Sequence, residues 1–201
     1  MTRCLLLAAL AVVLGVPVQA QSDLSGSPFA LGASGSYAGA VSHSGGYDLD
    51  RLRAPGVSLD IAYGRLSAGA GLAFYDGETA VNLAAGLHLA RNPEALLATT
   101  AGVSLQLLQN GTTSVTPSIS HARRVFGTPG IAVVPGASVG LVGPLDSDVG
   151  PAAVAMGSVG LVLGRGLTRA VLVPSVVWAR GGADVVTLGV SAGITRGFGR
   201  P

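Results

Sequence analysis

The chain is poor in the residues on which disulfide bonding, thiol chemistry and nucleic-acid recognition depend. Its 201 residues include no lysine and one cysteine, and they are only 4% aromatic and 11% charged. The cysteine, Cys4, lies in an N-terminal apolar run, so the rest of the chain has no thiol for a disulfide, a catalytic thiolate or a metal site. The net charge of +2 is too small, and the arginines too scattered, for a face that binds nucleic acid.

Long apolar runs are also missing beyond the N-terminus. Arg3 precedes an apolar run that ends at Val16, and small residues precede the polar segment that follows. This order predicts a secretory signal peptide over residues 1–20, cleaved after Ala20, and an exported domain over residues 21–201. A membrane anchor is the alternative, but the run is shorter than the roughly 20 residues that a membrane-spanning helix requires.

The chain has alternation in place of long apolar runs. Apolar residues alternate with small or polar ones over segments of similar length, and short turns rich in the 31 glycines separate them. Such alternation predicts β-strands with one apolar face, and their length of about ten residues exceeds the five or six usual in soluble proteins. We predict about ten strands, with about eight and twelve as the neighbouring counts. They cover residues 29–41, 57–64, 66–75, 79–90, 95–108, 112–121, 130–142, 152–163, 167–179 and 184–198.

The last of these segments alternates most regularly. From Val186 every second residue is apolar except Arg196, and Thr, Gly and Ser stand between them. Phe198 closes the segment as an aromatic residue. A final strand of this kind resembles the terminal strand of bacterial outer-membrane β-barrel proteins.

The resemblance implies an all-β fold: a transmembrane, antiparallel, up-and-down β-barrel located in the cell outer membrane. It also implies two partners, the outer-membrane lipid and the barrel assembly machinery. That machinery would recognise the C-terminal strand, with Phe198 as part of the assembly signal.

The charged residues sort into two sets when the turns are taken alternately, with the adjoining strand ends included. The turns after odd-numbered strands are mainly acidic, with Asp48, Asp50, Arg51, Arg53, Asp76, Glu78, Asp146, Asp148, Arg180 and Asp184. The turns after even-numbered strands are mainly basic, with Arg65, Arg91, Glu94, Arg123, Arg124 and Arg165. A soluble β-sandwich also keeps charges in its loops, but it does not sort them by turn parity. We therefore predict a barrel with an acidic mouth, which has the longer loops, and a basic mouth.

Three features do not fit a simple alternating pattern. Pro117, Pro135 and Pro174 fall inside expected strands, where each removes a ladder hydrogen bond unless a bulge accommodates it. Asn92-Pro93-Glu94 has the order of a helix start, so the fifth strand is entered either through a single helical turn or directly. Residues 171–173 are all apolar, so their facing stays unassigned.

Candidate catalytic and metal-binding residues are sparse. The three histidines, His43, His88 and His121, do not have the spacing of metal ligands. His43 and His121 adjoin serines, but neither forms the serine, histidine and acid arrangement of a hydrolase. We therefore predict no catalytic residue, metal or cofactor, and keep a lipid-modifying barrel enzyme as a third functional alternative.

The expected inner face is the basis of the functional prediction. Its residues are mostly Ser, Gly, Ala and Thr, and its candidate lumen-lining residues are Asp60, His88, Ser104 and Gln106. Side chains already fill a barrel of about eight strands, so about ten strands lined by small residues predict a narrow lumen. The first hypothesis is a small passive pore lined by these four residues, with acidic outer loops that favour cations. The alternative is a non-conducting structural or adhesion barrel that acts through outer loops such as residues 43–56.

Overall fold

The structure, a computed structural model, describes residues 27–43, 53–75, 78–109, 111–128, 130–145, 150–180 and 184–198. All the helices and strands assigned within these ranges are of one kind, β-strands, and none is a helix. No helix within them is long and apolar enough to cross a membrane. The predicted signal peptide and its cleavage site lie outside the described residues.

Eleven strands follow one another along the chain. They are β1 (Phe29–His43), β2 (Arg53–Tyr63), β3 (Leu66–Tyr75), β4 (Glu78–Asn92), β5 (Leu97–Leu108), β6 (Thr113–Arg123), β7 (Phe126–Thr128), β8 (Ile131–Pro144), β9 (Ala152–Leu163), β10 (Thr168–Arg180) and β11 (Asp184–Phe198). The bounds predicted for β3, β9 and β11 are confirmed. The start predicted for β2, at residue 57, is wrong, because the strand already begins at Arg53. The short β7 forms where the sequence predicts only a turn.

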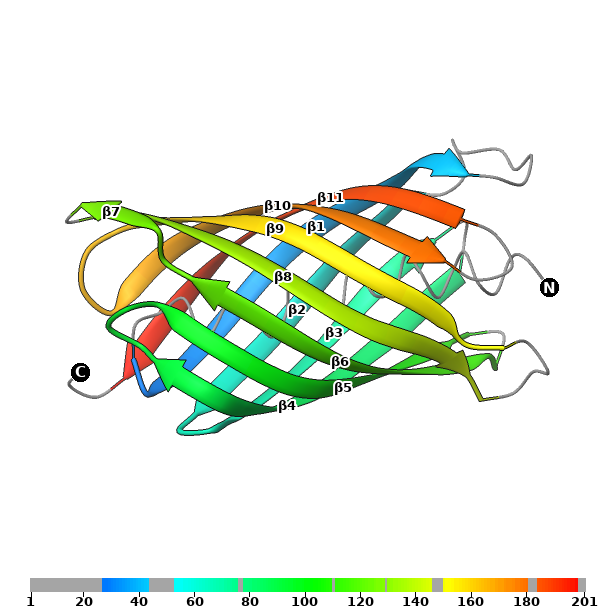
Figure 1. Cartoon of the computed structure of the whole chain (residues 1–201), viewed down its shortest axis with the longest axis horizontal. Helices are drawn as coiled ribbons and strands as arrows, with labels where there is room; N and C mark the ends of the chain where they lie inside the picture. Colours follow the sequence, from blue (N-terminus) through cyan, green and yellow to red (C-terminus); the bar gives the residue numbers. More distant parts are fainter. Residues whose placement is uncertain are drawn as a thin grey trace.

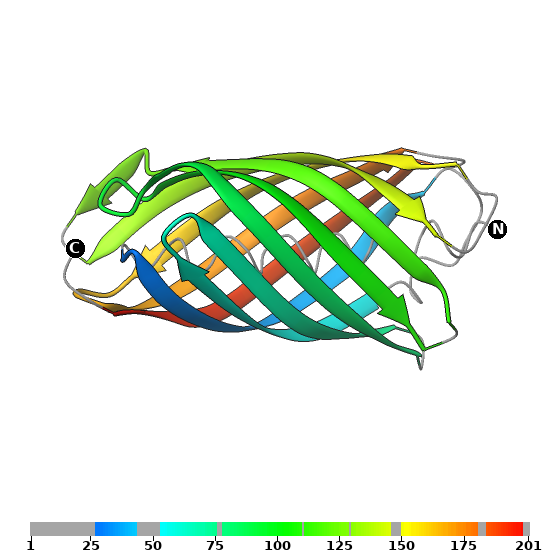
Figure 2. The same ribbon diagram turned by 90° about the horizontal axis from the view of Figure 1, so that it is seen from below.

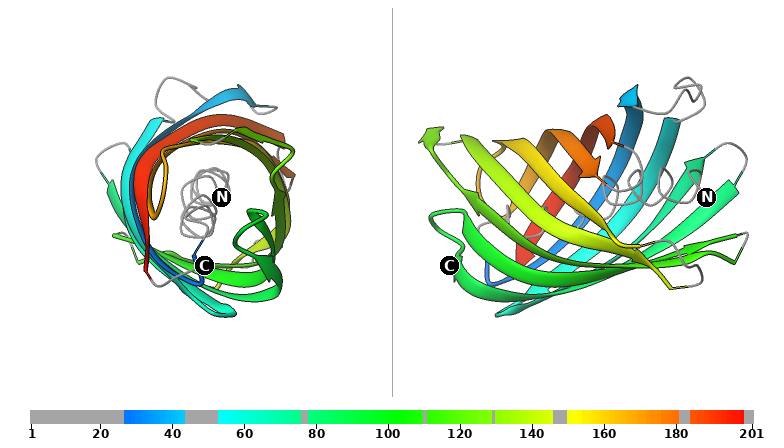
Figure 3. Two further views of the ribbon diagram at one scale, coloured as in Figure 1. Left: turned by 90° about the vertical axis from the view of Figure 1, so that its left-hand side faces the viewer. Right: turned by 45° about the vertical axis from the view of Figure 1, so that its right-hand side comes forward.

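These strands form one closed antiparallel barrel. Neighbours in the chain pair with one another, β1 also pairs with β11, and β6 pairs with β8, so ten strands complete the ring with β7 at its edge. The ring is seen end-on in Figure 3. The predicted all-β fold, up-and-down order and strand number are confirmed.

The strands cross the barrel wall obliquely (Figures 1 and 2). Following the register around the wall from Phe29 leads back to β1 at Ser42 instead of at Phe29. Strand tilt and a staggered register of this kind are what allow a twisted sheet to close on itself.

The wall has an apolar outer face and an inner face of mostly small or polar residues. In β2, Leu59 is 66% exposed whereas its neighbour Asp60 is 4% exposed. Successive side chains of a strand point to opposite faces, so the same alternation continues along the wall. It also settles the facing of residues 171–173, because Val171 and Val173 are buried and Leu172 is exposed.

Two of the three prolines lie at gaps in the ladders, and none of the three lies at a bulge. The β6–β8 ladder is interrupted at Pro117 and the β9–β10 ladder at Pro174, with the same register on both sides of each gap. Pro135 stays paired with Val159. Bulges occur elsewhere, before Ser42 in β1 and before Ala90 in β4.

A hydrogen-bonded turn, and not a helix, leads into β5. The Ala95 N–H donates to Asn92 Oδ1 at 3.0 Å, and the Leu96 N–H donates to the Pro93 carbonyl at 3.2 Å. Leu96 has a φ of 47°, in the left-handed region, which prevents a right-handed helix from continuing. The strand therefore begins at Leu97 instead of at residue 95.

Candidate functional site: the inner wall and the two mouths

The two titratable residues predicted to line the interior both lie on the inner wall. Asp60 on β2 is 4% exposed and His88 on β4 is 1% exposed. Gly32 on β1 makes room for the carboxylate, because a Cβ atom at that position would lie 2.8 Å from Asp60 Oδ2. His88 Nδ1 is hydrogen-bonded to Thr100 Oγ1 at 2.9 Å, which fixes the imidazole against β5.

The other two predicted lining residues lie on β5. Gln106 is buried, and its Oε1 accepts a hydrogen bond of 3.5 Å from Ser114 Oγ. Ser104 is half-buried on the same face of the strand. Asp60 and His88 lie toward one mouth and Gln106 toward the other, so the four residues share the inner wall without forming a single site.

A belt of small and apolar side chains lines much of the inner wall near the mouth where β5 ends, with no member on β6 or β11. Its members form one buried cluster: Ala38, Ala54, Ala73, Ala80, Leu108, Val142, Val154, Met156, Val177 and Ala179. We call this cluster the apolar belt. The sequence reasoning missed it because the valines of β8 and β10 have apolar neighbours, which hides the facing of each strand.

The two mouths differ in charge. The arginine-rich mouth, at the end that carries β7 in Figure 1, contains Arg65, Arg91, Arg123, Arg124, Arg165, Arg169 and Arg196, with Glu94 as the acidic residue among its described positions. This distribution confirms that the turns predicted to be basic share one end. At the opposite mouth, Arg180 Nε lies 3.9 Å from Asp184 Oδ1. Most of the acidic residues predicted there lie outside the described residues, namely Asp48, Asp50, Asp76, Asp146 and Asp148.

Arg91 ties several chain segments together at the arginine-rich mouth. Its Nη1 donates to the carbonyls of Pro28 at 2.9 Å and Gly64 at 2.8 Å, and its Nη2 donates to the Ser27 carbonyl at 3.0 Å. Ser27 Oγ in turn donates to the Phe198 carbonyl at 2.8 Å. The sequence predicts only a rim charge at this position, because these acceptors come from distant parts of the chain.

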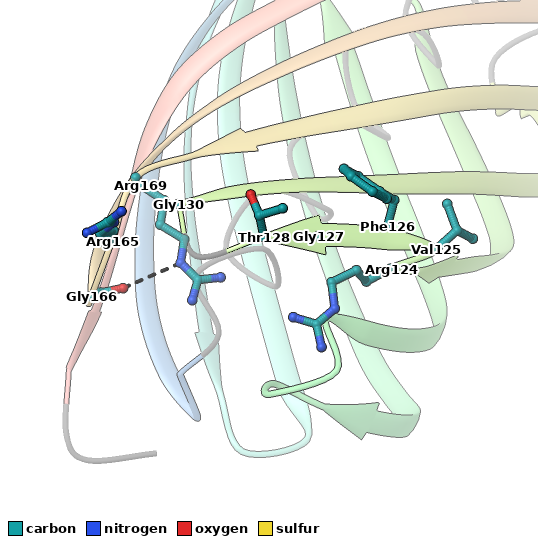
Figure 4. A pocket seen from close by; sticks show the side chains of 10 residues that line it. Arg124, Val125, Phe126, Gly127, Thr128, Gly130, Arg165, Gly166 and Arg169 are labelled. Atoms are coloured by element: carbon teal, nitrogen blue, oxygen red, sulfur yellow. Dashed lines mark hydrogen bonds between the residues drawn. The ribbon is translucent and has the colours of Figure 1, made fainter.

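A pocket of about 650 Å³ also opens at the arginine-rich mouth (Figure 4). Arg124, Arg165 and Arg169 line it, and none of its described lining residues is acidic. The turn between β9 and β10 is joined to the turn before β8, because the Gly164 N–H donates to the Gly130 carbonyl at 2.8 Å. The pocket is therefore a basic recess beside two turns that a backbone hydrogen bond joins.

The other histidines do not build a catalytic or metal site within the described ranges. His121 Nδ1 is hydrogen-bonded to Thr99 Oγ1 at 2.8 Å on the outer face of the wall. The adjacent Ser120 points to the inner face, so it cannot act together with His121. The side chain of His43 lies outside the described residues. In the part of the chain that the structure describes, no three His, Cys, Asp or Glu residues are grouped closely enough to hold a metal ion.

A comparison with protein-family models finds no match for this chain, and a comparison with curated protein sequences finds none either. Among solved structures, the chain is similar to a bacterial polysaccharide outer membrane secretin, with a TM-score of 0.42 and 12% sequence identity. The similarity covers 73% of this chain and 57% of that chain, so this chain spans little more than half the length of the structure that it matches. At this TM-score the likeness carries no argument about function.

Proposed function

We propose that this chain is a transmembrane barrel of the outer membrane, exported with a cleaved signal peptide, and that it forms a small passive pore. The observation that supports the membrane location is the exposed apolar outer face. Five large apolar side chains around the ring are 39% to 66% exposed, namely Ile61, Leu59, Ile119, Val139 and Ile194. An apolar surface this continuous is unusual for a soluble monomer, whereas hydrocarbon covers it without cost.

The inner wall supports the pore. Ten strands enclose more space than the roughly eight that side chains can fill, and most inward residues here are small. Polar residues such as Asp60, His88 and Gln106 supply hydrogen-bonding groups along the wall. The apolar belt is the part of the inner wall that we expect to resist wetting, because its lining is apolar.

Planar-bilayer recording of the purified, folded protein tests this function. We expect discrete conductance steps, and we expect Met156→Trp to reduce their size because Met156 is an inward member of the apolar belt. Ala155→Trp is the matched control, since the neighbouring position points to the outer face and a tryptophan there meets lipid. Folded protein that gives no steps would contradict the pore and favour the non-conducting barrel.

A further inference from the structure

We propose that the pocket at the arginine-rich mouth binds the phosphate group of an organic phosphate through Arg124, Arg165 and Arg169. This site goes beyond the pore, because it needs only a folded barrel and no conduction. Arg124 lies in the segment after β6, Arg165 in the turn between β9 and β10, and Arg169 at the start of β10. The pocket thus forms where β6, β8, β9 and β10 pair side by side.

The charge of the pocket points to an anion. Arg124, Arg165 and Arg169 line one recess whose described lining has no carboxylate. Figure 4 shows Arg124 and Arg169 extending into the same space. Arginine is suited to phosphate because its planar group offers paired N–H donors that match two phosphate oxygens.

The local backbone holds these arginines in place. Gly127 lies against Arg124, where a Cβ atom would be 3.2 Å from Arg124 Cδ, and Gly130 lies against Arg165, where a Cβ atom would be 3.4 Å from Arg165 Nε. Arg169 Nε donates to the Gly166 carbonyl at 3.4 Å, which orients its guanidinium group. Glycine at these positions lets the arginine side chains pack along the pocket wall.

The size of the pocket and its apolar border indicate a ligand larger than inorganic phosphate. A volume of about 650 Å³ leaves room beside the phosphate for an organic group. Val125 and Phe126 border the pocket and are 68% and 60% exposed. The ligand is therefore a phosphate ester, either the head group of a phospholipid or a water-soluble organic phosphate.

Binding to the folded protein in a neutral detergent tests the site with two probes, glycerol 3-phosphate and short-chain phosphatidylglycerol. We expect at least one probe to bind, and we expect Arg165→Gln and Arg169→Gln each to weaken binding by about tenfold, as the loss of a charged hydrogen bond does. Arg65→Gln is the matched control, because it removes the same charge from the same mouth outside the pocket. Heat-modifiable gel mobility verifies that each variant is folded, and Arg165→Gln alone decides the result if Arg169→Gln does not fold.

The two probes separate the two sources of phosphate. Binding of phosphatidylglycerol alone assigns the pocket to lipid head groups, and binding of glycerol 3-phosphate alone assigns it to a soluble ester. Both results support the phosphate site. Binding of neither probe would overturn it, as would equal weakening by Arg65→Gln and Arg165→Gln, because general attraction to a basic surface would then account for the affinity.

Discussion

Phe29 and Phe198 are paired in register across the seam between the first and last strands of the ring, with their ring centroids 5.1 Å apart. Tyr63 on β2 adds an edge-on contact to Phe29, with centroids 6.0 Å apart. The Arg196 guanidinium carbon lies 5.5 Å from the centroid of the Phe198 ring. Aromatic contacts therefore join three strands at the point where the barrel closes, and the residue that we propose as an assembly signal also stabilises the seam.

Replacement of Phe198 tests the contribution of the seam. We expect Phe198→Ala to lower the free energy of unfolding by about 1 to 3 kcal/mol, because it removes a ring pair and a cation–π contact. Urea unfolding in detergent micelles measures this change, and Phe198→Tyr should restore most of the loss. Phe126→Ala is the control, since that ring lies at the same mouth and is 60% exposed. Equal losses for Phe198→Ala and Phe126→Ala would show that the seam contacts add nothing.

Arg91 should be irreplaceable by lysine. We expect Arg91→Lys and Arg91→Gln each to lower the free energy of unfolding by about 1 to 3 kcal/mol, because neither side chain can bond to three carbonyls at once as the guanidinium does. Hydrogen exchange should show faster exchange of the Gly64 amide, which donates to Pro28 beside this cluster. Arg65→Lys, on the neighbouring exposed turn, should leave both properties unchanged. Full stability of Arg91→Lys would mean that charge alone is required.

Gly140 should tolerate no side chain. A Cβ atom there would lie 2.7 Å from the Pro117 carbonyl oxygen and 3.1 Å from Ser118 Cβ, so the backbone beside the proline gap would have to move. We expect Gly140→Ala to destabilise the barrel by about 1 to 3 kcal/mol in urea unfolding. Gly157→Ala is the matched control, because its nearest neighbour, Val176 Cγ1, is 3.7 Å away, and the loss of chain flexibility should make this change neutral or stabilising.

The free energy of folding lost to an arginine on the outer face should depend on how deep in the bilayer that arginine lies. Val103 lies midway along β5 and is 46% exposed, whereas Leu66 begins β3 at the arginine-rich mouth and is 61% exposed. We expect Val103→Arg to cost about 2 to 4 kcal/mol and Leu66→Arg about 0 to 1 kcal/mol when folding is measured in lipid vesicles. Similar small costs at both positions would indicate that water, and not hydrocarbon, covers the outer face.

Much of the fold can be predicted from the sequence, because one face of each strand is apolar and the turns contain glycine and charged residues. The bounds of β9 and β11 follow from this pattern, as does the inward facing of Asp60. The inward facing of Val173 cannot be predicted in the same way, because its neighbours on both sides are apolar.

The functional residues are harder to predict than the strands. Arg165 and Arg169 adjoin one turn, but Arg124 is far from them in the chain and shares no motif with them. The alternation of the turns along the sequence places Arg124 and Arg165 in basic turns at one end. It does not indicate that Arg124 shares a pocket with Arg165 and Arg169, because that depends on the pairing of β6 with β8, β8 with β9 and β9 with β10.

The surroundings of Trp178 provide the most direct test of the membrane barrel. It is the chain's single tryptophan, it lies on the outer face of β10 near Arg180, and it is 39% exposed. In vesicles containing lipids brominated along their acyl chains, we expect strong quenching of its fluorescence by bromine, strongest for bromine near the head groups, and weak quenching by aqueous iodide. Quenching by iodide without quenching by brominated lipid would contradict a membrane barrel, because the outer face would then lie in water.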